Sequence, residues 1–155
     1  MSDVKDLQPY AANTEGLTGV LEDLRATMPS SIVFKVVGYV VNAFENVTQG
    51  DVLYARSSDG QVGKAIANDT LDKAVVAGIA ETTVTAGNEV RVIVTGQVAV
   101  STSLDPGDMY FLSASSAGGL TKTPPSSAGQ YLTLVGEAGT SNQIVLKIKR
   151  PIQLR

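Results

Sequence analysis

Turn sequences recur at short intervals through most of this chain, and they constrain its fold more than any other feature. The turns are predicted at Gln49-Gly50-Asp51, Ser58-Asp59-Gly60, Ala86-Gly87-Asn88, Asp105-Pro106-Gly107-Asp108, Ala117-Gly118-Gly119 and Glu137-Ala138-Gly139. Such residues supply the positive or preset φ that a reversing strand needs. Short alternating runs lie between them, such as residues 90–94 and 144–148. Short strands with regular turns predict an all-β sandwich or barrel from residue 31 to residue 155.

Two segments of this β region have their own character. Residues 32–41 are almost continuously β-branched or aromatic, which predicts a strand buried on both faces. The segment Asp69 to Val75 is the one helical candidate after residue 30.

The β region also repeats itself, with an offset near 57 residues. The matched segments are Gly50–Tyr54 with Gly107–Phe111, Val62 and Lys64 with Leu120 and Lys122, Val76–Ala80 with Leu134–Ala138, and Val90, Val92 and Val94 with Ile144, Leu146 and Ile148. We interpret this as two related β units, at about residues 46–99 and 103–152. A unit near 50 residues buries too little surface to be stable alone, so the two are expected to share a core. Chance similarity between two β-rich segments is the alternative.

Residues 1–30 differ from the rest and are interpreted as an extended N-terminal arm. Thr14 can cap a short helix, and Pro29 would end it. Gly16 and Gly19 weaken this helix by about 1 kcal/mol each relative to Ala. Its apolar stripe, at helical spacing, consists of Leu17, Val20, Leu21, Leu24 and Met28. The stripe is expected to pack on its own domain or on a neighbour. These five residues are the candidate contacts with another subunit or with a partner surface.

Composition excludes several kinds of chemistry. The chain has no Cys and no His, which excludes disulfides, Cys-containing zinc sites and imidazole catalysis. A net charge of −3 lacks the basic footprint of a nucleic-acid partner. No apolar run is long enough to cross a membrane, and the start lacks the pattern of a signal peptide. We expect no nucleic-acid or membrane partner, no cofactor and no metal, and synthesis in a host cytoplasm.

The carboxylates are interpreted as turn formers, and no residue is assigned a catalytic role. Asp51, Asp59, Asp105 and Asp108 stand in predicted turns, where their side chains can bond nearby backbone amides. A glycosidase would instead need two carboxylates about 5–10 Å apart in a cleft. The segment from Gly60 to Ala65 lacks the spacing of a phosphate-binding loop and is predicted to be a hairpin. We therefore expect a protein that is not an enzyme.

Positive charge gathers near the C-terminus. Lys147 and Lys149 alternate with Ile148, so both are expected to face outward on a strand. Lysines on an edge strand discourage pairing with other chains, which is the favoured explanation. The alternative is that they meet an acidic surface on a partner.

Both halves of the β region resemble known modules of phage virions. The second half resembles a small β module of tailed-phage head fibres, through Leu104–Ser113, Gly118–Thr121, Val135–Ala138 and Lys149–Ile152. The first half, from Gly50 to Val100, is similar to phage capsid decoration proteins.

The resemblance implies a capsid decoration (cement) protein: β-rich, often trimeric, and placed on the outer capsid surface. Its implied partners are the major capsid protein and further copies of itself, in a homotrimer. Extended termini commonly clamp neighbouring subunits in such proteins, a role that suits the arm. The second hypothesis is a fibre or spike module that binds a host receptor or glycan.

Overall fold

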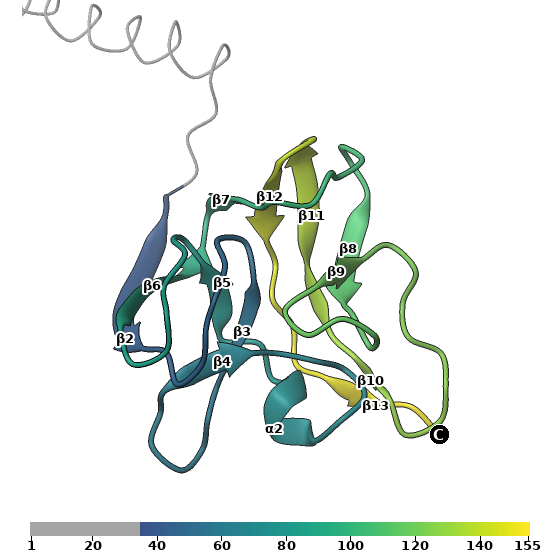
Figure 1. Cartoon of the computed structure of the whole chain (residues 1–155). Helices are drawn as coiled ribbons and strands as arrows, with labels where there is room; N and C mark the ends of the chain where they lie inside the picture. Colours follow the sequence, from purple (N-terminus) through teal and green to yellow (C-terminus); the bar gives the residue numbers. More distant parts are fainter. Residues whose placement is uncertain (1–34) are drawn as a thin grey trace, which may run out of the picture. The chain divides into compact units, whose positions relative to one another are not determined.

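The computed structural model describes residues 35–155, and the fold is almost entirely β (Figure 1). One sheet contains β2 (Val37–Asn42), β3 (Val52–Ala55), β4 (Val62–Lys64), β5 (Gly78–Ala80) and β6 (Glu89–Thr95). A second sheet contains β7 (Gln97–Ala99), β8 (Met109–Leu112), β9 (Leu120–Thr121), β11 (Leu134–Thr140) and β12 (Gln143–Leu146). A small third sheet pairs β10 (Tyr131–Leu132) with β13 (Ile152–Gln153), and α2 (Leu71–Ala74) follows β4. The predicted all-β class is confirmed.

The two large sheets have the same topology. Their strand orders are β2-β6-β5-β3-β4 and β7-β12-β11-β8-β9, antiparallel throughout. Read in this order, β6, β5, β3 and β4 correspond to β12, β11, β8 and β9, which are the strands whose sequences repeat. The duplication seen in the sequence therefore has a counterpart in strand order.

Matched hydrogen bonds support this correspondence. The Gly50 N–H donates to the Ala80 carbonyl at 2.9 Å, and the Gly107 N–H donates to the Ala138 carbonyl at 2.8 Å. Both glycines lie in the left-handed region, with φ of 90° and 89°. This conformation favours glycine, which explains why the turn before β3 and the turn before β8 both carry Gly-Asp.

The first strand of each sheet does not follow from the two units expected from the sequence. Strand β2 precedes residue 46, and β7 pairs with β12 in the second sheet although the repeat placed its residues at the end of the first unit. Both strands form an edge of their sheet. Their sequences do not resemble each other, so the repeat did not predict that they occupy equivalent positions.

Two apolar clusters form the interior. One lies within the first sheet, which curls until Ala43 makes a parallel bridge to Val62; its members are Ala43, Val47, Leu53, Val62, Ala80, Val90 and Val92. The other is shared by both sheets and includes Val52, Ile79 and Ile93 together with Leu112, Val135 and Ile144. Backbone hydrogen bonds also join the sheets, from Val52 N–H to the Gly118 carbonyl and from Gly118 N–H to the Ala65 carbonyl.

Three local predictions can be compared with the structure. Helix α2 lies within the predicted segment, with Thr70 accepting a hydrogen bond from the Lys73 N–H as its N-cap. Strands β3 and β4 form the predicted hairpin around Gly60. The turn predicted at Glu137-Ala138-Gly139 is wrong, because these residues lie inside β11, where a register shift between Ala138 and Thr140 marks a bulge.

Within residues 35–155, no helix has the length and apolar character needed to span a membrane.

Candidate interaction surface

The turn carboxylates are held by nearby partners. Asp59 pairs with Arg56 at 2.6 Å, and Lys122 lies between Asp105 and Asp108. The Asp51 carboxylate accepts a hydrogen bond from the Thr48 N–H at 2.9 Å. The carboxylates of Asp51 and Asp59 bond backbone amides within their turns, as expected of turn formers, whereas those of Asp105 and Asp108 pair with the Lys122 side chain. Among the described residues, no group of three or more acidic side chains converges in a way that could hold a metal ion.

Asp51 also lies against the second sheet. Its side chain approaches Gly118 so closely that a Cβ at that glycine would lie 3.0 Å from the carboxyl carbon. Burial raises the pKa of Asp51, and the hydrogen bond from Thr48 opposes that rise. Asp108, its counterpart in the repeat, is instead paired with Lys122 at 3.3 Å. The two carboxylates have different surroundings and share a place in a turn.

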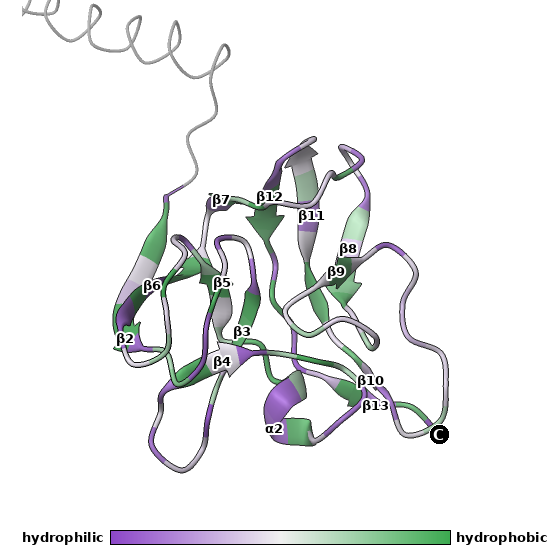
Figure 2. Ribbon diagram, viewed as in Figure 1, coloured by the Kyte–Doolittle hydropathy of each residue, from purple (hydrophilic) through white to green (hydrophobic). Residues whose placement is uncertain are grey.

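Apolar side chains on β2 and just before it are exposed to solvent. Val36, Val37, Tyr39 and Val40 have exposed fractions between 41% and 58%, and together they are called the β2 surface here. Figure 2 shows apolar colouring at the start of this strand. The prediction that residues 32–41 form a strand buried on both faces is wrong for these four residues.

The position of β2 in its sheet explains this exposure. Strand β2 is an edge strand that pairs on one side only, with β6. The equivalent edge strand of the second sheet is β7, where Val98 is only 5% exposed because it packs into the shared core. The apolar sequence of β2 was read correctly as β structure, but a continuous apolar run carries no signal for which side of a strand has a neighbour.

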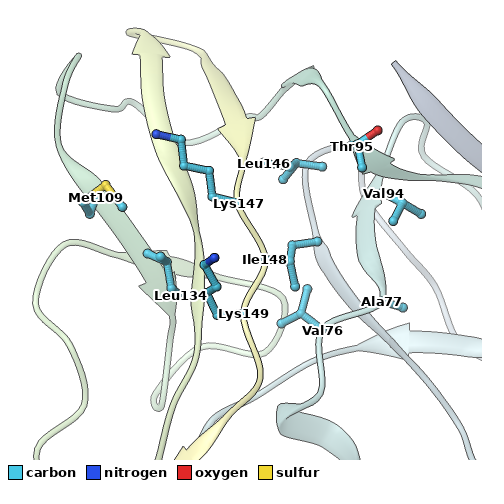
Figure 3. Close-up of a pocket in the computed structure, with 10 residues that line it drawn as sticks. All are labelled: Val76, Ala77, Val94, Thr95, Met109, Leu134, Leu146, Lys147, Ile148 and Lys149. Carbon is cyan, nitrogen blue, oxygen red and sulfur yellow. The ribbon is translucent and has the colours of Figure 1, made fainter. Parts of the chain in front are cut away.

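A groove of about 640 Å³ opens between the two sheets (Figure 3). It is called the inter-sheet groove here, and its lining residues are Val76, Ala77, Val94, Thr95, Met109, Leu134, Leu146, Lys147, Ile148 and Lys149. Val76 and Val94 come from the first unit, and their repeat counterparts Leu134 and Ile148 come from the second. The groove therefore lies where the two units meet.

Exposed apolar side chains extend the groove. Met109 on the groove wall is exposed, and so is Val75, the neighbour of Val76 in sequence. Thr95 in the groove lining is also the sheet partner of Val37 on β2. Apolar patches of this kind on a soluble protein mark sites of interaction with other molecules.

Two lysines line the same groove. Figure 3 shows Leu146 and Ile148 on the side of Val76 and Val94, with Lys147 and Lys149 on the opposite side of the chain. Lys147 forms an ion pair with Glu137 at 2.6 Å, whereas Lys149 has no acidic partner among residues 35–155. Both side chains are exposed, as predicted.

The explanation of these lysines as edge protection is wrong. Strand β12 lies between β7 and β11, so it is not an edge strand. Beyond its last residue, the Lys147 N–H still donates to the Val135 carbonyl and the Lys149 N–H to the Leu134 carbonyl. The lysines therefore guard no free edge, and the alternative of an acidic surface on a partner stays a prediction.

The candidate contacts of the arm, Leu17, Val20, Leu21, Leu24 and Met28, lie outside the described residues. Comparison of the chain with models of known protein families finds no match, and comparison with curated proteins finds none either. The fold, the β2 surface and the inter-sheet groove are therefore the features that bear on function.

Proposed function

We propose that this protein is a structural virion protein that binds the outer surface of a phage capsid and stabilises the shell. Its partners are the major capsid protein and further copies of itself, in a homotrimer. The observation that supports this most directly is the inter-sheet groove, where exposed apolar side chains lie beside Lys149, which has no acidic partner among residues 35–155. Those features suit a protein partner that offers an apolar side chain next to a carboxylate.

The body suits attachment to a lattice. Its two sheets share one core and are joined by backbone hydrogen bonds, so the groove is lined by strands that hold their positions. A preorganised surface loses little conformational entropy on binding. Copies linked in an oligomer bind a repeating shell through several contacts at once, so each contact can be modest.

Binding to purified expanded capsids of the encoding phage tests the proposal. Met109→Glu places a charge on the exposed groove wall, and Lys149→Glu reverses the charge of the unpaired lysine. We expect each variant to bind at least tenfold more weakly than the natural chain in a co-sedimentation titration. Ile152→Glu is the matched control, because Ile152 is 61% exposed on β13 and is not part of the groove lining.

Two outcomes would contradict the proposal. One is that capsids and the purified major capsid protein both fail to retain the natural chain. The other is that both groove variants, folded by circular dichroism, bind capsids as tightly as the Ile152→Glu control. Binding to host cells or to glycans in place of capsids would support the hypothesis of a receptor-binding fibre module.

A further inference from the structure

We propose that β2 is the strand through which copies of this chain contact each other, with β2 of one copy against β2 of the next around a symmetry axis. The inference builds on the proposed function, in which the protein is a homo-oligomer, and it names the contact surface of that oligomer. The occupant of the β2 surface is thus a second copy of the chain.

The first argument is that β2 is an unguarded sheet edge. Strand β2 has six residues, VGYVVN, with no charged residue and no proline among them. An exposed edge of this kind pairs with other strands and promotes aggregation unless something covers it. Its side chains add apolar area, since Val40 is 58% exposed and Tyr39 is 41% exposed.

The second argument comes from the other sheet edges of the described residues. Strand β4 is bridged at Val62 by Ala43, the residue directly after β2, so the two edges of the first sheet meet at this one point and residues 37–42 have no partner strand on that side among the described residues. Strand β9 has two residues and is followed by Lys122, and β7 has three residues with Val98 buried in the shared core. Within residues 35–155, β2 is the one long apolar edge that the fold leaves uncovered.

Whatever shields the β2 edge from other strands has to be present while the chain is being made. A capsid surface is met only after the chain has folded, so it cannot protect the edge during synthesis. A second copy is available throughout. Two uncharged β2 strands can approach each other around a symmetry axis without placing like charges opposite each other.

The path of the chain is consistent with this contact. The body begins at Lys35, directly before β2, and 34 residues precede it. Copies that meet at β2 share a common point of entry for these segments.

Cysteine cross-linking tests the contact directly, because the natural chain has no Cys. Val36→Cys, Val37→Cys and Val40→Cys are each made in the full chain and oxidised, and each is also treated with a short bismaleimide. A disulfide requires Cα atoms about 4.4–6.8 Å apart, so it reports on close self-contact. We expect covalent dimers from at least one β2 variant, and none above the level of random collision from the control Ile152→Cys.

Mass in solution provides the second measurement. Val40→Glu puts a charge into the contact, and we expect light scattering to show a shift from oligomer to monomer. The control Ile152→Glu should keep the mass of the natural chain. Circular dichroism and thermal melting of Val40→Glu establish that it is folded before its mass is interpreted.

The inference and the proposed function can fail separately. A monomeric natural chain, absence of β2 cross-links, or an unchanged mass for folded Val40→Glu would overturn the inference. Cross-linked β2 strands in a protein that does not bind capsids would uphold the inference and overturn the proposed function. The groove variant Met109→Glu should keep the oligomeric mass while losing capsid binding.

Discussion

At the scale of single residues, two glycines at matched positions of the repeat let neighbouring strands approach each other. A Cβ added at Gly78 would overlap the Ile93 carbonyl oxygen, and one added at Gly136 would overlap the Val145 carbonyl oxygen. Both obstacles are backbone atoms in the adjacent strand, so neither can move without disturbing the sheet. The repeat predicted that these glycines are equivalent, but only the packing shows that each one allows the adjacent strand to approach closely.

Gly136→Ala should therefore destabilise the protein. Overpacking a well-packed interior costs about 1–3 kcal/mol, and we expect the free energy of unfolding to fall by that amount in urea titrations. Gly139→Ala in the same strand is the control, because the nearest atom to its added methyl group is Gln97 Nε2, the end of a side chain, at 3.1 Å. Equal unfolding midpoints for the two variants would contradict the prediction.

At the scale of elements, a buried hydrogen bond attaches α2 to the second sheet. The Thr133 hydroxyl donates to the Ala74 carbonyl at 3.0 Å, and Thr133 is fully buried just before β11. The carbonyl belongs to the last residue of α2, where no further turn of helix satisfies it. A helix of four residues is too short to be stable alone, so this contact helps to hold it against the body.

Thr133→Val should weaken this attachment. Valine has nearly the shape of threonine but no donor, so the Ala74 carbonyl would be left buried without its partner, at a cost of about 1–3 kcal/mol. The free energy of unfolding measures the loss. Thr133→Ser keeps the hydroxyl and removes only a methyl group, and it should retain more stability than Thr133→Val. The reverse order would show that the hydrogen bond contributes little.

At the scale of the whole molecule, charge is divided unevenly along the chain. Residues 1–34 contain Lys5 and Arg25 against Asp3, Asp6, Glu15, Glu22 and Asp23, which accounts for the whole net charge of −3. Residues 35–155 therefore carry as many basic as acidic side chains. A body with no net charge gains little long-range steering toward a partner, so under the proposed function its attachment depends on close contacts such as those of the groove.

Deleting residues 1–28 should separate folding from attachment. Both apolar clusters of the body lie between residues 43 and 146, so we expect the truncated chain to keep its melting temperature within a few degrees. The deletion removes the apolar stripe of the arm, and affinity for expanded capsids should fall at least tenfold. A folded truncation with unchanged capsid affinity would rule out a clamping role for the arm.

The sequence by itself determined the all-β class, the correspondence along the chain between the repeated strands, and the position of α2. These depend on alternation, turn residues and helix caps, which act over a few neighbouring residues. Only the tertiary structure decided that β2 is an exposed edge, that β12 is an interior strand, that the lysines after it line a groove, and that Gly139 lies in a bulge. The physical reason is that a strand's neighbours are chosen by hydrogen bonds between distant segments, and the local pattern of a strand is the same whether one side or both are paired.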